Sequence, residues 1–314
     1  MKIVILTFSY NDWPSVQAVL GLLDEKLREA GFQAQALIVD DASTEAQPAD
    51  LAEKRYEAFR RVNVLRLRQN LGHQRAIAVG LCHVYAHYDF DAIVVMDGDG
   101  EDLPADAIRL IQRAQETGNS EVIFAERSRR SESLLFRVFY HLYRLIHVVL
   151  TGKGIRVGNF SIMPKELVGG LVVEPNLWNH YAAAVFNSRL PRATIPTTRG
   201  KRLYGKPQLN FTALVVHGLS AIACYSEIIG VRVLLVSLIV SSVLVLGIAA
   251  TVVIRFATDL AIPGWATTVV GILMVVLLQI VSLAALFTLS ILTNRKSAGI
   301  IPIRDYAYWV RPAS

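Results

Sequence analysis

Residues 91–102 read DAIVVMDGDGED, an apolar run that ends in the four carboxylates of Asp97, Asp99, Glu101 and Asp102. The chain that carries this acidic cluster is basic overall, with a net charge of +6. Carboxylates held this close together repel one another unless solvent or a bound cation offsets the repulsion. The stretch is therefore either a solvated turn or a cation site at the end of a buried strand.

The surrounding sequence alternates short apolar runs with amphipathic stretches. Strands are predicted at 2–8, 34–40, 62–67, 91–97 and 121–126, and helical periodicity lies at 14–30, 47–60, 73–87 and 104–117. This alternation predicts an α/β fold with a mostly parallel sheet and helices on both faces. Ligands of such sheets bind beyond the carboxyl ends of the strands.

Polar clusters follow the first four predicted strands at these ends. They are Ser9, Tyr10, Asn11 and Asp12 after the first strand, Asp40, Asp41 and Ser43 after the second, Asn70, His73, Gln74 and Arg75 after the third, and Asp97, Gly98 and Asp99 after the fourth. Four clusters at corresponding positions predict one shared site, and the alternative is a set of unrelated loops.

The acidic cluster has the ligand chemistry of a hard divalent cation. Side chains that alternate along an extended backbone face the same side, so Asp97, Asp99 and Glu101 form one set. Ligands that are all oxygen favour Mg²⁺ or Mn²⁺, which keeps positions for phosphate oxygens. A nucleoside diphosphate is therefore the expected partner, and Gly98 leaves room for its approach. We expect Asp102 to cap the following helix instead.

The clusters after the second and third strands suit the rest of a nucleotide. Asp40 and Asp41 can accept hydrogen bonds from a base or a ribose, although they or Ser43 are alternatively a helix cap. His73 and Arg75 stand at a predicted helix start, where backbone N–H groups favour an anion. For His73, capping or packing is the alternative.

Two uncharged stretches near the C-terminus are long enough to cross a bilayer, which takes roughly 20 apolar residues. They lie at 233–254 and 265–293. A buried hairpin in a soluble core is the alternative. Basic residues flank the outer ends of the pair, at Arg232 and at Arg295 and Lys296. The positive-inside rule therefore places both termini in the cytoplasm, at the inner membrane.

The predicted organisation divides the chain into four parts. They are a cytoplasmic domain at 1–208 with an interfacial amphipathic helix at 134–150, a juxtamembrane helix at 209–229, a transmembrane hairpin at 230–294 and a cytoplasmic tail at 295–314. The alternative for 134–150 is a helix packed in the core. The lipid bilayer is thus an expected partner, a homo-oligomer is possible, and no nucleic acid is expected.

Several motifs resemble, in order and spacing, the nucleotide-sugar domain of glycosyltransferase family 2. They are FSYND (8–12), VDDAS (39–43), NLGHQRAI (70–77) and MDGDGED (96–102). With AERSRRSES (125–133), VGNFSIMPKEL (157–167), RGKRLYGKPQLNF (199–211) and the two spans, the chain is similar to the polyprenyl-phosphate hexosyltransferases, the group that includes dolichol-phosphate mannose synthase.

The resemblance implies a GT-A type nucleotide-sugar-binding domain and a role for particular residues. Asp97 and Asp99 would bind metal and diphosphate, with Glu101 where the family often has Gln. The acceptor phosphate would contact Arg127, Arg130, Ser133, Arg202 and Lys206, of which Arg127 and Arg130, like Asp99, count as catalytic. Arg202, Gly205 and Lys206 match a mobile loop that closes over the donor. Asn159 and Pro207 depart from the Asp and Ser that relatives often carry.

The implied reaction is metal-dependent, inverting transfer of a hexose from a nucleotide-diphosphate sugar to polyprenyl phosphate at the cytoplasmic membrane face. UDP-glucose is the favoured donor, GDP-mannose is possible, and the product would serve cell-envelope glycan synthesis. A lipid monophosphate is already an anion at neutral pH, so it needs no general base. The alternatives are a polysaccharide synthase, which typically carries a QxxRW motif absent here, and a non-catalytic membrane scaffold.

Overall fold

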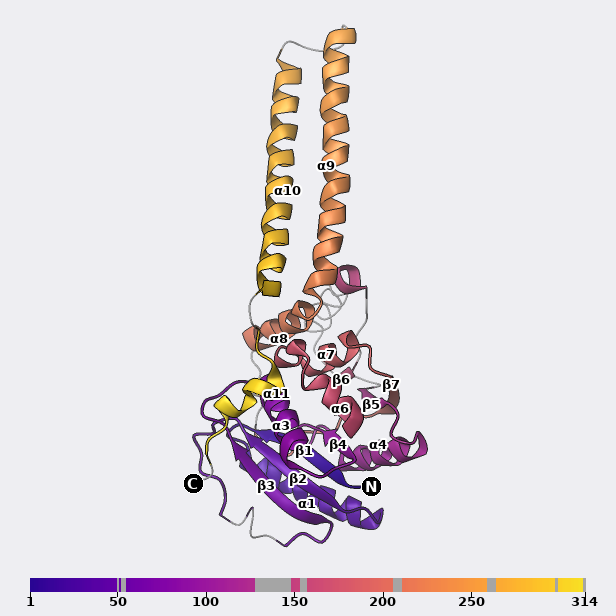
Figure 1. Ribbon diagram of the computed structural model, residues 1–314, viewed down its shortest axis with the longest axis vertical. Coiled ribbons are helices and arrows are strands. Elements are labelled where there is room, and N and C mark those ends of the chain that lie inside the picture. The colour runs from indigo at the N-terminus through magenta and orange to yellow at the C-terminus, as the bar shows by residue number, and fades with distance from the viewer. Residues whose placement is uncertain are drawn as a thin grey trace. The chain divides into compact units, whose positions relative to one another are not determined.

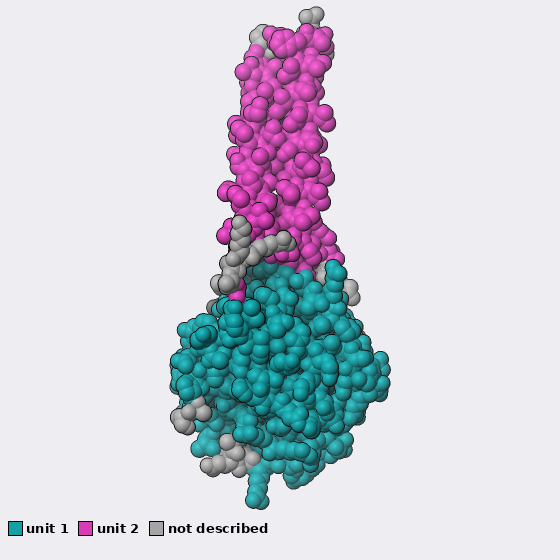
Figure 2. All heavy atoms as spheres, viewed as in Figure 1, with its two compact units in different colours: residues 1–145, 153–224, 300–314 teal, residues 146–152, 225–299 magenta. Residues whose placement is uncertain are grey.

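The computed structural model describes residues 1–49, 51, 55–127, 148–152, 157–205, 211–258, 264–296 and 299–312 (Figure 1). The chain divides into two compact units, coloured separately in Figure 2. The first contains Met1–Leu145, Lys153–Cys224 and Ile300–Ser314, and the second contains Ile146–Gly152 and Tyr225–Gly299. The C-terminal residues therefore belong with the N-terminal domain and not with the hairpin that precedes them.

A seven-stranded sheet forms the centre of the first unit, in the order β3-β2-β1-β4-β6-β5-β7. The strands are β1 (Ile3–Ser9), β2 (Ala34–Asp40), β3 (Phe59–Arg66), β4 (Ala92–Val95), β5 (Val122–Arg127), β6 (Val157–Pro164) and β7 (Arg192–Thr197). Among the strands of the described residues, β6 alone runs antiparallel to its neighbours. The predicted mostly parallel α/β sheet is confirmed, and β6 and β7 are additions that periodicity did not reveal.

Helices cover both faces of the sheet and bury two separate apolar layers. Alternate residues of β1 face opposite layers: Ile3 and Ile5 lie with α1 (Trp13–Glu29) and α4 (Pro104–Glu116), whereas Val4 and Leu6 lie with α3 (His73–His87). The layer of α3 also includes α6 (Lys165–Leu171), the 3₁₀ turn η1 (Pro175–Trp178) and α7 (Tyr181–Asn187).

Three of the four predicted helices are present, and the fourth is wrong at its end. The stretch 47–60 was expected to be helical, but residues 55–58 have no helix and β3 begins at Phe59. Residues 50 and 52–54 of that stretch lie outside the described residues. Phe59 and Arg60, the last two residues of that stretch, belong instead to β3, which pairs with β2 as an edge strand of the sheet.

The strand register brings the carboxyl ends of the parallel strands to one edge. Ser9 of β1 is paired with Asp40 of β2, which is paired in turn with Arg66 of β3. On the other side of β1, Leu6 is paired with Val95 at the end of β4. The loops that follow these four strands therefore emerge side by side, as the sequence predicted.

The second unit contains α9 (Ser226–Ala257) and α10 (Trp265–Lys296), which pack against each other. Both are apolar all round, and only 0% and 6% of their most apolar windows are buried. The alternative of a buried hairpin in a soluble core is therefore wrong, and both helices are long and apolar enough to cross a membrane. In the first unit, α8 (Phe211–Ala223) precedes them. Of the stretch 134–150, only residues 148–150 are described.

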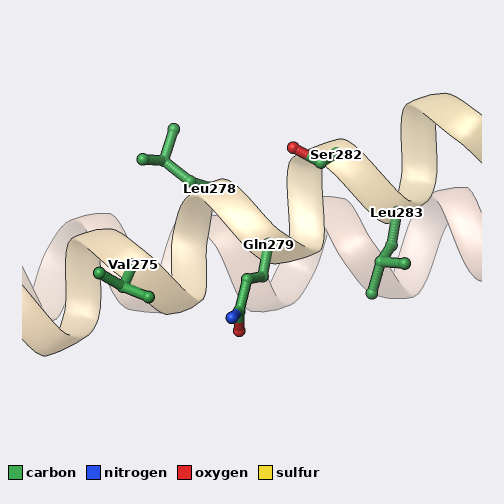
Figure 3. Close-up of a pocket in the computed structure, with 5 residues that line it drawn as sticks. All are labelled: Val275, Leu278, Gln279, Ser282 and Leu283. Atoms are coloured by element: carbon green, nitrogen blue, oxygen red, sulfur yellow. The ribbon is translucent and has the colours of Figure 1, made fainter.

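One face of α10 carries polar side chains in the middle of its apolar length. Figure 3 shows Gln279 and Ser282 with Val275, Leu278 and Leu283 around a groove on this face. Gln279 lies midway along the candidate span Trp265–Thr293. Its side chain is exposed and has no hydrogen-bond partner among the described residues.

The C-terminal segment folds onto the first unit through α11 (Pro302–Asp305) and the 3₁₀ turn η2 (Tyr306–Trp309). The Ile303 N–H donates to the Val172 carbonyl at 2.9 Å, and Val310 forms an antiparallel bridge with Leu67. Figure 1 shows α11 beside α3, which it contacts. The segment is thus an integral part of the sheet domain.

Candidate active site

The acidic turn (residues 97–102) follows β4 and is closed by its own side chains. The Asp102 carboxylate accepts from the Asp97 N–H at 2.9 Å, and Asp99 accepts from the Glu101 N–H at 2.9 Å. Asp102 does not cap α4, whose N-terminal residue Leu103 makes no side-chain cap. The predicted cap is therefore wrong: Asp102 is buried under the turn and holds it shut.

The two glycines of the acidic turn are required by close packing. A Cβ at Gly98 would lie 2.8 Å from the Thr7 Oγ1 atom and 3.0 Å from the Phe8 carbonyl oxygen, both on β1. Gly100 has a φ of 88°, and a Cβ there would lie 2.5 Å from Leu203. Other protein atoms therefore already fill the space that a side chain at Gly98 or Gly100 would need, and the glycines allow the turn to pack closely on β1 and Leu203.

An arginine loop (residues 198–205) lies against the acidic turn and pairs with its carboxylates. Arg202 forms ion pairs with Asp99, at 3.1 Å, and with Asp12 at the start of α1. Arg199 donates from Nε to the Glu101 carboxylate at 2.8 Å. Asp12 belongs to the predicted polar cluster after the first strand, whereas Arg199 was not among the predicted site residues, because only the fold brings the loop to the turn.

Backbone contacts fasten the same two segments together. The Gly200 N–H donates to the Glu101 carbonyl at 2.8 Å, and the Leu203 N–H donates to the Asp99 carbonyl at 3.0 Å. The side chains of Arg202 and its two partners are each only 18–19% exposed. This degree of burial makes the ion pairs stronger than pairs on an open surface.

The acidic turn matches a divalent cation in the kind of ligand that it offers. The side-chain atoms that it could offer as metal ligands are all carboxylate oxygens, which Mg²⁺ and Mn²⁺ prefer. Within the part of the chain that the structure describes, no three acidic, His or Cys side chains converge as a metal cage. Asp99 and Glu101 turn instead toward Arg202 and Arg199, so a cation must compete with arginine for Asp99.

The loops after β1 and β2 are joined by the side chain of Asn11. Its amide oxygen accepts from the backbone N–H groups of Thr44 and Glu45, at 2.8 and 3.1 Å. The Asn11 N–H donates to the Ser43 hydroxyl at 2.9 Å, and Ser43 donates its own N–H to Asp40 at 2.9 Å. Ser43 therefore ties two loops together and is not a helix cap.

Asp41 joins the loop after β2 to the loop after β3. Its two carboxylate oxygens accept from the N–H groups of Leu71 and Gly72, at 2.7 and 2.9 Å. Burial raises the pKa of Asp41, although these two hydrogen bonds oppose the shift. Asp41 therefore positions the start of α3, while Tyr10 and Asn70 stay exposed at the rim.

A chain of buried amides fixes the protonation of His73. The Tyr181 N–H, which can only donate, bonds to the Gln74 amide oxygen at 2.7 Å. Gln74 must then donate to the Asn159 oxygen, at 3.1 Å, which leaves the Asn159 NH₂ to donate to His73 Nε2 at 2.9 Å. His73 is therefore the neutral tautomer with its proton on Nδ1.

This tautomer also decides how His73 can interact with the nearby carboxylate of Asp97. His73 Nε2 lies 3.7 Å from the Asp97 carboxylate, which is longer than a hydrogen bond, and it has no proton to donate. The His73 ring packs on Phe8, with centroids 4.1 Å apart. His73 is thus uncharged, and its one ring acceptor, Nε2, is already used by the Asn159 amide.

The remaining predicted residues fall into two groups. Arg75 lies over the ring of Trp178, 5.7 Å from its centroid. Arg127 is the last residue of β5, where it is paired with Thr197 of β7. Arg130, Ser133, Lys206 and Pro207 lie outside the described residues.

The architecture is that of a GT-A-like domain. It resembles glucosyl-3-phosphoglycerate synthase from Mycobacterium tuberculosis, solved with Mn²⁺, UDP-glucose and phosphoglyceric acid, with a TM-score of 0.52 and 16% identity over 73% of this chain and 80% of that one. It also resembles mannosyl-3-phosphoglycerate synthase from Rubrobacter xylanophilus, with a TM-score of 0.50 and 14% identity over 72% and 73% of the two chains.

Residues 4–169 match the model of glycosyl transferase family 2, and the chain is an enzyme of that family. An undecaprenyl-phosphate 4-deoxy-4-formamido-L-arabinose transferase from Klebsiella pneumoniae is 24% identical over 289 residues, which cover 89% of this chain and 84% of the relative. The protein of the same name from Salmonella paratyphi B is 24% identical over 88% and 82% of the two chains.

Proposed function

We propose that this enzyme transfers a hexose from a nucleotide-diphosphate sugar to polyprenyl phosphate at the cytoplasmic membrane face. One observation carries the proposal: similarity to a transferase named for undecaprenyl phosphate covers 89% of the chain, well beyond the family match that ends at residue 169. A match over this share of the chain must extend well past residue 169, into the C-terminal part whose two apolar helices would anchor the domain where a lipid phosphate emerges.

The donor would bind along the sheet edge with its diphosphate at the acidic turn. Asp97, Asp99 and Glu101 would hold Mg²⁺ or Mn²⁺, which neutralises the charge that develops on the departing diphosphate. Arg202 would exchange its pairing with Asp99 for the diphosphate, a task that suits a planar guanidinium. The loops ordered by Asn11 and Asp41 would hold the nucleoside, with UDP-glucose the first donor to test and GDP-mannose the second.

A lipid phosphate acceptor needs no general base, so the proposed reaction does not require His73 to accept a proton. In the proposed step, a phosphate oxygen of the lipid bonds to the anomeric carbon as the bond from that carbon to the diphosphate breaks, which inverts the configuration. The nucleoside diphosphate leaves, and no proton must be removed because the lipid phosphate is already ionised. The acceptor instead needs cations, for which Arg127, Arg130 and Lys206, together with Ser133, are the candidates.

The hairpin of α9 and α10 would span the inner membrane with both chain termini on the cytoplasmic side, since its outer ends carry the basic residues. In that setting Gln279 would lie near the bilayer centre with an unpaired amide. Because an amide both donates and accepts, a second copy of the chain could pair with it at the same depth. We therefore include a homo-oligomer assembled through α10 in the proposal.

The test of the proposed function compares two carboxylate variants of the full-length protein. Asp99→Asn should lower sugar transfer to polyprenyl phosphate by roughly 100-fold or more, because it removes a charge from the diphosphate site. Asp89→Asn removes an exposed carboxylate that, among the described residues, forms its ion pair with Lys2, and this variant should retain activity. Full transfer by the Asp99 variant, or none by the wild type with any donor of a nucleotide-sugar panel, would overturn the proposal.

A further inference from the structure

A surface hollow of about 310 Å³ lies beyond the carboxyl ends of β2 and β3, and the far end of the chain forms part of its wall. Its polar lining comes from Asp40, Ser43, Thr44, Glu45, Gln47, Arg66 and Arg311. Arg311 follows the membrane hairpin and is 245 positions beyond Arg66, so a gap of this length hides the pairing from local sequence patterns.

Backbone bonds hold Arg311 in place independently of its side chain. The Arg311 N–H donates to the Arg66 carbonyl at 2.9 Å, and the Arg68 N–H donates to the Trp309 carbonyl at 2.8 Å. The Trp309 ring packs on Trp178, with centroids 5.7 Å apart. The segment therefore pairs antiparallel with residues 66–68, at and just after the end of β3, and this pairing places Arg311 at the hollow.

The hollow and the acidic turn are separated by the length of a nucleoside diphosphate. The hollow lies at the ends of β2 and β3, and the acidic turn follows β4, with β1 between β2 and β4. At about 4.8 Å per strand, two and a half strand intervals amount to about 12 Å. A ribose and two phosphates can bridge that distance along one sheet edge.

The lining offers both kinds of hydrogen bond that a nucleobase needs. The Asp40 carboxylate, which uses one oxygen for the Ser43 N–H, can accept from a ring N–H. Arg66 donates to Gln47 at 3.0 Å, which holds its guanidinium at the wall. Arg311 lines the hollow, and among the described residues its guanidinium makes no hydrogen bond, so its donors are available to a ligand.

We propose that this hollow receives the nucleobase of the donor, and that Arg311 of the C-terminal segment donates hydrogen bonds to its carbonyl oxygens. The inference rests on the proposed function and adds a residue from beyond the membrane hairpin to the donor site. Because the segment and the base share this wall, nucleotide binding also stabilises the docking of the segment on β3.

The experiment measures binding by full-length, detergent-solubilised protein in Mn²⁺, using UDP, GDP and inorganic pyrophosphate as probes in calorimetric titrations. Arg311→Ala should weaken binding of the preferred nucleoside diphosphate by roughly 10-fold to 100-fold, the loss expected for a hydrogen bond from a charged donor. Pyrophosphate, which lacks the base, should bind the variant and the wild type alike.

Arg304→Ala is the matched control, since Arg304 belongs to the same segment but pairs with Asp305 away from the hollow. It should bind all three probes as the wild type does. Arg311→Gln, which keeps a donor of similar reach, should lose less affinity than Arg311→Ala.

The possible failures are distinguishable. Unchanged nucleotide binding by Arg311→Ala, or an equal loss of nucleotide and pyrophosphate, overturns the role of Arg311 and leaves the proposed function standing. A wild-type protein that binds neither nucleoside diphosphate overturns the proposed function, and the pocket assignment with it.

Discussion

Arg202 occupies the carboxylate that a divalent cation would need, so its removal should increase metal affinity. The guanidinium pairs with both Asp99 and Asp12. A cation that binds Asp99 must displace or share this arginine. In Arg202→Ala that competition disappears, and we expect Mn²⁺ to bind the nucleotide-free variant more tightly than it binds the wild type.

The size of the gain follows from the ion-pair geometry. The N···O distance to Asp99 is 3.1 Å and the side chains are about one-fifth exposed. Charges about 4 Å apart at an effective dielectric constant of 20 attract by about 4 kcal/mol. Desolvation and side-chain ordering offset most of this energy, leaving about 1–2 kcal/mol. The affinity for Mn²⁺ should therefore rise roughly 5-fold to 30-fold.

Paramagnetic resonance of free Mn²⁺ during titration measures this affinity directly. Lys201→Ala is the control, because it removes the same charge one position away from an exposed residue with no ion pair among those described. A gain shared equally by both variants would reflect net charge only. Unchanged or weaker Mn²⁺ binding by Arg202→Ala would refute the competition.

Three further predictions concern stability and assembly. Asp41→Asn should lower the free energy of unfolding by about 1–2 kcal/mol, because one of two backbone N–H groups loses its acceptor. Since burial raises the pKa of Asp41, the folded state holds that proton more tightly, and the wild type should gain stability over this variant in thermal melts as the pH falls from 7 toward 4. Burial and the neighbouring His87 lower the pKa of His83 to about 4. The stability that neutral His83 contributes is therefore complete above pH 6.5 and is lost as the pH falls through 4. After discounting for partial exposure, we expect the free energy of unfolding to fall by about 1–2 kcal/mol, and His83→Gln should abolish that loss. Gln279→Leu should weaken self-association in bilayers by about 1 kcal/mol in energy-transfer measurements, and equal association of both proteins would exclude α10 as the interface.

Much of the site edge was predictable because its signals are local. The apolar runs before Asn11, Asp41 and Asp97 are strands of one parallel sheet, and polar residues after such strands must gather at one edge. The two long apolar stretches were equally clear, since composition and length suffice to recognise them.

The ion pairs within the site were not predictable from local patterns, because they join segments far apart in sequence, and only the family resemblance placed Arg202 near the donor. Arg199 and Arg202 reach the acidic turn only after β7 has paired with β5 across the sheet. Arg311 reaches β3 only because the chain returns from the hairpin to the first unit. No periodicity or spacing encodes such contacts.

Two errors have simple physical causes. Asp102 has the right residue type and position for a helix cap, but the nearby N–H of Asp97 competes for its carboxylate and binds it. Gly98 looked like space for a ligand, whereas the side chains and backbone of β1 fill that space. In both cases tertiary packing decided between two uses of the same residue.

The most direct test of the central claim is the mass of the lipid product made by the purified full-length protein. The protein would be incubated with a nucleotide-sugar panel, undecaprenyl phosphate and Mn²⁺, and the molecular mass of the extracted lipid would be measured by mass spectrometry. We expect one hexose joined to each lipid phosphate, with release of one nucleoside diphosphate. A glycan built on sugar hydroxyls, or unmodified lipid with every donor, would contradict the account.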